Sequence, residues 1–244
     1  TEAKPGNTID SPSMRSWLDT LAAAHQLCRV SANVDWDLEI GAIARVNMSQ
    51  GGPALLFENI KDYEHGRIRR LMTCGLGNRQ QVALLLGLPV DTDSKTLVRH
   101  LKDTYRRPIP PVLVDDGPVK RHRLSGDEID LYEFPAPRWH YMDAGRYINT
   151  FAAVVTKDPE TDTRNVGIYR GQLLGKDKIG KLLIRTQGWG QHFLKYGQKP
   201  EPMPVAIVYG WHDVLPFCAS SCFPRNICEW DMMGAILGRP VELV

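Results

Sequence analysis

Three residues that lie far apart in the sequence share a ligand chemistry. Asn165, His192 and Glu229 offer a neutral oxygen, a neutral nitrogen and one carboxylate. Such a mixed set of donors suits Mn²⁺ or Mg²⁺ with further positions left open, as for a metal shared with a ligand phosphate. The alternative interpretation is that they are scattered polar residues at strand ends. Residue types and spacing leave both interpretations open.

The run Asn165-Val-Gly-Ile-Tyr-Arg170 ends in an arginine. The guanidinium of Arg170 adds a permanent positive charge near these residues. Five positions separate Asn165 from Arg170. In an extended strand an odd separation places two side chains on opposite faces. A bend or bulge near Gly167 is therefore expected if both residues serve one site.

Two glycine motifs resemble phosphate-binding loops only in part. Residues 175–181 (GKDKIGK) have Walker A spacing, but Leu182 follows where Ser or Thr would hold magnesium, and strand-like residues replace the helix. We interpret this segment as a solvated hairpin turn. Gly75-Leu-Gly77 lacks the third glycine of a dinucleotide fingerprint, so it does not indicate a dinucleotide-binding site.

Other reactive side chains favour structural interpretations. Three cysteines near Glu229 suggest a nucleophile or a metal site, but small buried packing is the commoner role: Cys218, Cys222 and Cys228. A histidine beside polar loop residues is more often a surface residue than a catalytic one, and we apply this interpretation to His140 and to His212-Asp213.

Strands and helices alternate in the first part of the chain. The first helix is expected to begin with Ser11 as N-cap and Pro12 at the first helical position. Further segments follow as a strand over 27–34, a helix over 38–46, a buried strand over 53–60 and helices over 79–87 and 94–107. The alternation predicts an α/β unit. The expected helical core residues are Trp17, Leu18, Leu21, Leu97 and Leu101.

The composition changes around residues 107–120, which are rich in proline, and we place a domain boundary there, between domains 1–118 and 119–244. Strand patterns follow at 148–156, 165–175, 181–187 and 204–210, separated by turn clusters, and predict a mainly antiparallel β domain. A helix is expected over 229–238. The last residues carry no cap or polar tail, so the end is expected to be a cut.

Composition excludes several classes of protein. The chain has 244 residues, 43% of them apolar and 24% charged, which is typical of a soluble globular protein. Its formal charge of +2 is too balanced for binding to a nucleic acid backbone. Five cysteines without a CxxC predict neither disulfides nor a zinc knuckle, and so a cytoplasmic protein. No run approaches the roughly 18 apolar residues of a membrane span, and no signal peptide is expected.

With these motifs in place, the sequence resembles the UbiD family of reversible, non-oxidative decarboxylases that use prenylated FMN. The similar segments occur in order along most of the chain: PALLFENI, YINTF, DPETDTRNVGIYR, GQH, PMPVAIVYG and EWDMMGAILGRPVELV. The resemblance implies an α+β protein in which an N-terminal α/β domain precedes a split β-barrel that binds the flavin.

The resemblance also implies site roles. Asn165, His192 and Glu229 would ligate Mn²⁺ or Mg²⁺ that bridges to the flavin phosphate, Thr150 would lie near an accompanying K⁺, and Arg170 would face the substrate carboxylate. The positions implied to contact the cofactor or its metals are Thr150, Asn165, Ile168, Tyr169, Arg170, Gln191, His192, Ser220, Ser221 and Glu229.

The chemistry implied by the resemblance needs an electron sink, because no side chain can delocalise the carbanion left when CO₂ departs from an sp² carbon. The prenylated flavin would supply that sink. Arg170 offers a planar fork of donors that can orient the leaving carboxylate. A carboxylic acid would then deliver the proton.

The sequence lacks the C-terminal part of the family pattern. In the family, the proton-donating acid lies in an EIV-type segment, and a C-terminal domain closes over the active site; neither is in this sequence. The chain is then a fragment, one subunit of a split enzyme, or a non-catalytic module that binds a flavin phosphate. The expected partners are an aromatic or α,β-unsaturated carboxylic acid, a flavin prenyltransferase that supplies the cofactor, a second chain with the C-terminal half, and further copies when complete.

Overall fold

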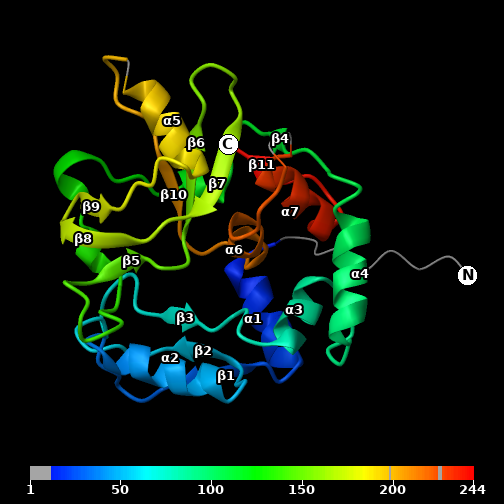
Figure 1. Cartoon of the computed structure of the whole chain (residues 1–244). Coiled ribbons are helices and arrows are strands. Elements are labelled where there is room, and N and C mark those ends of the chain that lie inside the picture. Colours follow the sequence, from blue (N-terminus) through cyan, green and yellow to red (C-terminus); the bar gives the residue numbers. More distant parts are fainter. Residues whose placement is uncertain (1–11, 198, 225–226) are drawn as a thin grey trace, which may run out of the picture.

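The computed structural model describes residues 12–197, 199–224 and 227–244, which form a mixed α/β structure (Figure 1). The first part of the chain places a small sheet among four helices: α1 (Met14–Ala23), β1 (Leu27–Val30), α2 (Glu39–Ser49), β2 (Ala54–Phe57), β3 (Leu71–Thr73), α3 (Arg79–Leu85) and α4 (Ser94–Thr104). β2 lies at the centre of this sheet, parallel to β1 and antiparallel to β3. All four of its residues are buried, as expected for an uninterrupted apolar strand.

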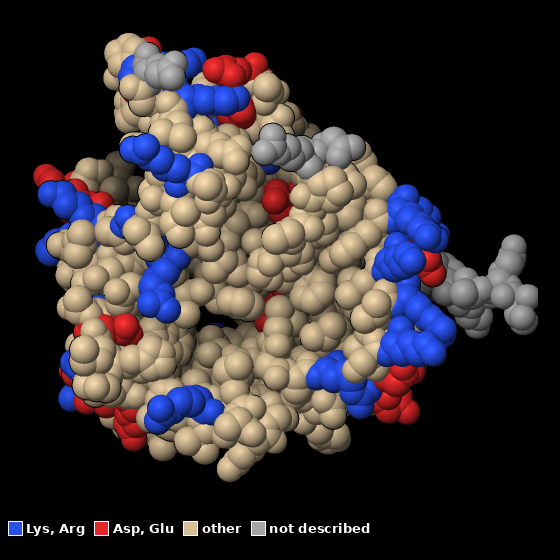
Figure 2. Space-filling view, in the orientation of Figure 1, with Lys and Arg blue, Asp and Glu red and all other residues tan. Residues whose placement is uncertain are grey.

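Three helices of the first part, α1, α3 and α4, begin at short polar side chains that cap them: Ser13, Asn78 and Asp93. The first helix begins at Met14, later than predicted, with Ser13 as its N-cap, whose side chain accepts the N–H of Ser16 at 3.1 Å. Ser11 lies outside the described residues, and Pro12 precedes the cap. Exposed Lys and Arg side chains line α4 on one edge of the molecule (Figure 2), and the opposite side of this amphipathic helix buries Leu97.

The second part is mainly antiparallel β structure, as predicted. Its elements are β4 (Val112–Leu113), η1 (Pro118–Lys120), η2 (Gly126–Glu128), η3 (Leu131–Glu133), β5 (Tyr147–Asn149), β6 (Ala153–Lys157), β7 (Arg164–Ile168), β8 (Gly171–Gly175), β9 (Lys178–Lys181), α5 (Gly188–Tyr196), β10 (Ala206–Val208), α6 (Val214–Ala219), α7 (Glu229–Leu237) and β11 (Glu242–Leu243). Among the described strands, the sheet orders are β10-β6-β7, β5-β8-β9 and β11-β4, none of them closed. The split β-barrel therefore stays a prediction.

Several of the predicted strand boundaries are wrong. The strand expected over 27–34 ends at Val30, and the one expected over 148–156 divides into β5 and β6. The strand expected over 181–187 is absent: β9 ends at Lys181, and Leu182, which follows, is 76% exposed. The Walker-like segment is the β8–β9 hairpin with two turn residues, which confirms its interpretation as a turn. The helices α5 and α6 were not predicted.

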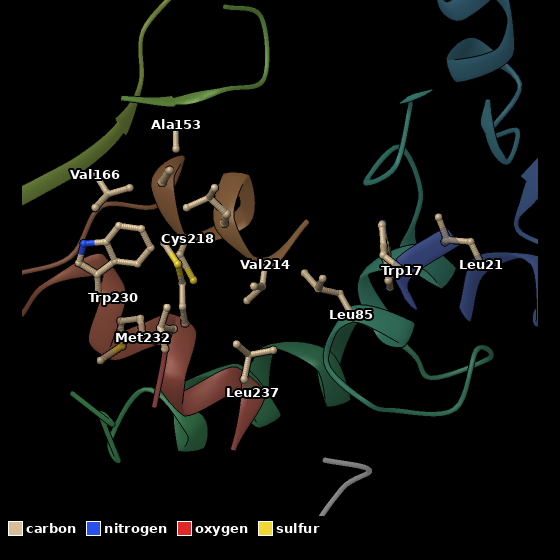
Figure 3. Packing of buried hydrophobic residues seen from close by; sticks show 14 of the residues in the cluster. Trp17, Leu21, Leu85, Ala153, Val166, Val214, Cys218, Trp230, Met232 and Leu237 are labelled. Carbon is tan, nitrogen blue, oxygen red and sulfur yellow. The ribbon is translucent and has the colours of Figure 1, made fainter. Parts of the chain in front are cut away.

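One buried cluster joins the two parts of the chain. It contains Trp17, Leu21, Ala54 and Leu85 from the first part, together with a larger group from the second part that includes Val166, Val214, Trp230 and Met232 (Figure 3). The two predicted domains therefore share a hydrophobic core, whereas their limits at 118 and 119 stay a prediction. In the described part of the chain, no helix combines the length and apolar character needed to cross a bilayer.

His212 and Asp213 lie in this junction, so the prediction that they are surface residues is wrong. They are 1% and 5% exposed, respectively. Trp17 of α1 donates its indole N–H to Asp213 Oδ2 at 2.8 Å, and the ring of Trp17 packs on that of His212. Burial raises the pKa of Asp213 to about 6 and lowers the pKa of His212 to about 4. Sequence context alone does not show that a helix packs over this pair.

The buried carboxyl of Asp213 predicts a pH-dependent gain in stability for Asp213→Asn. The pKa of the folded state, about 6, exceeds the ordinary value of 3.8, so ionisation costs folding free energy at high pH and not at low pH. We expect the variant to raise the free energy of unfolding by about 1–2 kcal/mol at pH 8, since the amide oxygen still accepts from Trp17. The gain should shrink progressively as the pH falls from 6 to 4. Urea unfolding of the parent and the variant at pH 8 and at pH 4 measures this gain. The titration of His212 is present in both proteins and cancels in the difference. A variant less stable than the parent at pH 8 would contradict this prediction.

Candidate functional site

The strand β7 carries the first candidate ligand at an open edge of its sheet. Asn165 pairs with Thr156 of β6, and the alternation of the strand turns Val166 into the core, where it is 1% exposed. Gly167 keeps the regular register opposite Val154, so β7 has no bulge at that residue. The chain instead turns at Tyr169 and Arg170, between β7 and β8.

His192 lies on α5, directly above the β6–β7 ladder. Its Nδ1 is 2.9 Å from Oγ1 of Thr156, the residue that pairs with Asn165. Burial lowers the pKa of His192, which favours the neutral imidazole that binds metal ions. Within the described residues, its Nε2 has no hydrogen-bond partner, so that nitrogen is available to a ligand.

Glu229 is the first residue of α7 and reaches β7 from the other side. Its Oε2 accepts the backbone N–H of Val166 at 3.1 Å. Burial raises the pKa of this carboxyl. A cation beside it would offset the cost of burying the charged form.

The side chain of Asn165 is oriented by two neighbours. Its Nδ2 donates to the hydroxyl of Tyr169 at 3.1 Å. Its Oδ1 faces Gly188, the first residue of α5, where a β-carbon would lie only 1.9 Å from that oxygen. A residue with a side chain at position 188 would therefore displace Asn165.

The structure thus gathers the three predicted ligands around residues 165–166. Asn165 Nδ2, His192 Nδ1 and Glu229 Oε2 each make a hydrogen bond to another residue, and the Glu229 carboxylate also accepts from its own backbone N–H. Within the described residues, Asn165 Oδ1 and His192 Nε2 have no hydrogen-bond partner and remain for a ligand. This pattern fits a metal site in which an outer layer of protein groups orients each ligand. In the described chain, no group of three or more His, Cys, Asp or Glu side chains is placed to hold a metal ion. A metal here would need the amide of Asn165.

Arg170 extends away from these three residues toward β5. It is exposed, and its guanidinium carbon lies 5.3 Å from the ring centroid of Tyr147. That distance suits a cation–π contact, which leaves the fork of N–H donors free to bind a carboxylate.

The other predicted cofactor residues make local contacts. Ile168 packs against the main core and pairs with Ala153. The side chains of the remaining four donate to nearby backbone carbonyls: Thr150 to Tyr147 at 3.1 Å, Gln191 to Thr186 at 3.3 Å, and Ser220 and Ser221 to Phe217 at 3.0 and 2.9 Å. Their roles toward a cofactor stay predictions.

Two residues of the site were missed in the sequence. Trp189 stacks on Tyr169 with ring centroids 4.7 Å apart, and Lys181 donates from Nζ to the carbonyl of Tyr169 at 2.9 Å. Burial lowers the pKa of Lys181 to about 8. The spacing of three residues between Trp189 and His192 places both on one face only if the segment is helical, which was not predicted, and Lys181 gave no signal.

The cysteines near Glu229 do not resemble nucleophiles. Cys218 is buried, as predicted, but Cys222 is exposed, so the packing interpretation is wrong for it. Burial raises the pKa of the Cys228 thiol to about 11, which disfavours a thiolate. His140 is exposed, in agreement with its interpretation as a surface residue.

The comparison with known protein families decides the identity of the chain. Residues 18–101 match the N-terminal domain of 3-octaprenyl-4-hydroxybenzoate carboxy-lyase, and residues 112–244 match its Rift-related domain. The chain belongs to the UbiD family. The residues that form the candidate site, from Thr150 to Glu229, all lie within the Rift-related match.

Several relatives of this UbiD chain are named as decarboxylases and are about twice its length. Pyrrole-2-carboxylic acid decarboxylase from Pseudomonas aeruginosa is 31% identical over 238 residues, which cover 94% of this chain and 48% of that enzyme. Vanillic acid decarboxylase from Sedimentibacter hydroxybenzoicus, in its closed form, has a TM-score of 0.88 at 31% identity and covers 98% of this chain and 50% of the other. An evolved dimeric form of the UbiD-class enzyme HmfF from Pelotomaculum thermopropionicum, in complex with prFMN, has a TM-score of 0.84 at 31% identity, with 96% and 52% covered. The chain spans about half the length of the curated relatives it matches.

The contact of Gly188 with Asn165 predicts a loss of metal binding for Gly188→Ala. The new β-carbon would overlap Asn165 Oδ1 and turn the amide away. We expect the Kd for Mn²⁺ to rise about tenfold or more, as for loss of an orienting contact at a metal ligand. Calorimetric titration with MnCl₂ in the presence of FMN measures the change.

Gly197→Ala, at the other end of α5, is the matched control, because a β-carbon there would meet nothing closer than 3.5 Å. Equal Mn²⁺ affinity for Gly188→Ala and the parent would contradict the assigned geometry.

Proposed function

We propose that this chain supplies the cofactor and metal site of a prenylated-FMN-dependent decarboxylase that acts on an aromatic or α,β-unsaturated carboxylic acid. The observation that carries the proposal is the convergence of Asn165, His192 and Glu229 on β7, where a hydrogen bond to another residue anchors each side chain. Relatives named as decarboxylases of pyrrole-2-carboxylic, phenolic and ferulic acids support the reaction class. The HmfF structure with prFMN supports the cofactor.

The donor set fits the metal and phosphate of such a cofactor. An amide oxygen, an imidazole nitrogen and a carboxylate suit Mn²⁺ or Mg²⁺ and leave coordination positions for phosphate oxygens. Asn165, His192 and Glu229 would hold the metal, and Thr150 would lie near K⁺. The residues proposed to line the flavin are Ile168, Tyr169, Gln191, Ser220 and Ser221. Within this proposal, β5 to β10 form the flavin-binding split β-barrel.

The chain itself orients the substrate rather than donating the proton. When bound, the prenylated flavin supplies the electron sink for the carbanion that the loss of CO₂ leaves behind. Arg170 binds the carboxylate through its planar donors and stays charged at any working pH. The ring of Tyr147 beside the guanidinium restricts its orientation. We assign the proton-donating acid to the C-terminal half of the enzyme, in the same or a second chain.

Native and denaturing mass spectrometry of protein co-expressed with a flavin prenyltransferase tests the cofactor assignment. We expect the chain to carry a prenylated flavin in the native spectrum, alone or with a second polypeptide. A lone 27.5 kDa species without flavin would contradict the proposal. Flavin binding without turnover, even after the C-terminal half is supplied, would instead favour a non-catalytic flavin-binding module.

The role of Arg170 predicts that Arg170→Ala separates binding of the cofactor from turnover. In the assembly that contains the C-terminal half, we expect turnover to fall at least about 100-fold, because the carboxylate loses its orienting partner. The bound flavin, measured from its absorbance per chain, should be unchanged. Arg164→Ala, which removes an exposed arginine at the other end of β7, is the control and should keep normal turnover. Unchanged turnover in Arg170→Ala would refute the assigned role.

A further inference from the structure

Tyr169 and Trp189 form the contact between the two elements that carry Asn165 and His192. Tyr169 directly follows β7, and Trp189 is the second residue of α5. Their rings are stacked, with centroids 4.7 Å apart and an interplanar angle of 18°. The separation between strand and helix at this point is therefore set by two rigid aromatic side chains.

The hydroxyl of Tyr169 has a specific task toward Asn165. It accepts the N–H of Asn165 Nδ2 at 3.1 Å. Only the oxygen of an amide can ligate a cation, so a ligating asparagine needs an acceptor for the N–H groups on its other side. Tyr169 provides that acceptor, and it therefore holds the amide with Oδ1 toward the ligand side.

Trp189 connects this arrangement to the second ligand. It precedes His192 by three residues, so the two side chains lie on the same face of α5, and both are buried. Because Trp189 rests on Tyr169, the height of His192 above β7 depends on the stacked pair. The same contact thus influences both the orientation of Asn165 and its distance from His192.

Two further residues keep Tyr169 in place. Lys181 of β9 donates from Nζ to the backbone carbonyl of Tyr169 at 2.9 Å and lies 5.7 Å from the centroid of the Trp189 ring. Gly167 makes room for the phenol, since a β-carbon at that position would lie 2.6 Å from the ring. The ring of Tyr169 thus covers Gly167 and cannot shift toward the strand.

We propose that Tyr169, stacked on Trp189, is a positioning residue that orients the Asn165 amide and sets the spacing of Asn165 and His192 for a divalent cation. This inference rests on the proposed function, because it assumes that these two residues ligate the metal. It adds a layer of residues that have no contact with the metal but determine how well it is held.

The variant Tyr169→Phe tests the proposal, because it removes the acceptor and keeps the ring stack. We expect its Kd for Mn²⁺, titrated with MnCl₂ in the presence of FMN, to rise about tenfold. The melting temperature should stay close to that of the parent. Tyr169→Leu also removes the stack and should weaken Mn²⁺ binding further. Tyr141→Phe, at a tyrosine that is 76% exposed, is the matched control and should bind Mn²⁺ like the parent.

Two contrary results are distinguishable. If the parent binds Mn²⁺ and Tyr169→Phe binds it equally well, the positioning role is refuted while the proposed ligand set stands. If the parent itself does not bind Mn²⁺, the ligand set of the proposed function is wrong, and this inference is refuted with it. A Tyr169→Phe variant that loses stability but keeps the parent's Mn²⁺ affinity would show a merely structural tyrosine.

Discussion

The candidate site depends on the unpaired edge of β7. Among the described strands this strand has a neighbour on one side only, and an edge strand leaves backbone N–H groups that need acceptors. Glu229 meets that need at Val166, and this hydrogen bond docks the first turn of α7 against the strand. The same bond brings a carboxylate beside Asn165. A requirement of sheet structure thus assembles part of a ligand set.

The alternation of β7 links this edge to the core. Val166 points into the buried cluster that joins both parts of the chain, while Asn165 and Gly167 face the site. A register shift of one residue would bury an amide and expose a valine, so the packing of the core fixes which residues face the candidate site. The stability of the junction, including the buried Asp213 and Trp17, is therefore coupled to the geometry of a site formed by other elements.

The sequence predicts the elements with strong periodicity and fails where tertiary packing decides. The helices that contain Trp17, Leu97 and Met232 follow from their apolar spacing. The helix α5 was missed because Gly188 and Gly190 are poor helix formers. Its stability comes instead from packing of Trp189 and His192 and from ion pairs of Lys195 with Asp158 and Glu160, at 2.7 and 2.8 Å. A single sequence does not reveal such contacts.

The candidate site divides in the same way. The three proposed ligands and Arg170 were named from the sequence through the family resemblance, whereas side-chain chemistry alone left a ligand set and scattered polar residues both open. The neighbouring residues Thr156, Trp189 and Lys181 could not be named, since they become relevant only when β6, α5 and β9 bring them against His192 and Tyr169. A supporting residue carries no chemical signature of its own, and its role follows from its neighbours.

The hydrogen bonds that hold Asn165, His192 and Glu229 come from different kinds of group, and this difference determines which of the three side chains a substitution can reorient. Asn165 and His192 are held by side-chain hydroxyls, of Tyr169 and Thr156, whereas Glu229 is held by the backbone of Val166. Substitution can remove either hydroxyl without moving the strand, but the backbone N–H disappears only if β7 itself changes or proline replaces the residue. The carboxylate is therefore the proposed ligand most firmly tied to the fold. The amide and the imidazole are the proposed ligands whose orientation a single side chain can tune, and the stacked contact between β7 and α5 lies between the two elements that carry them.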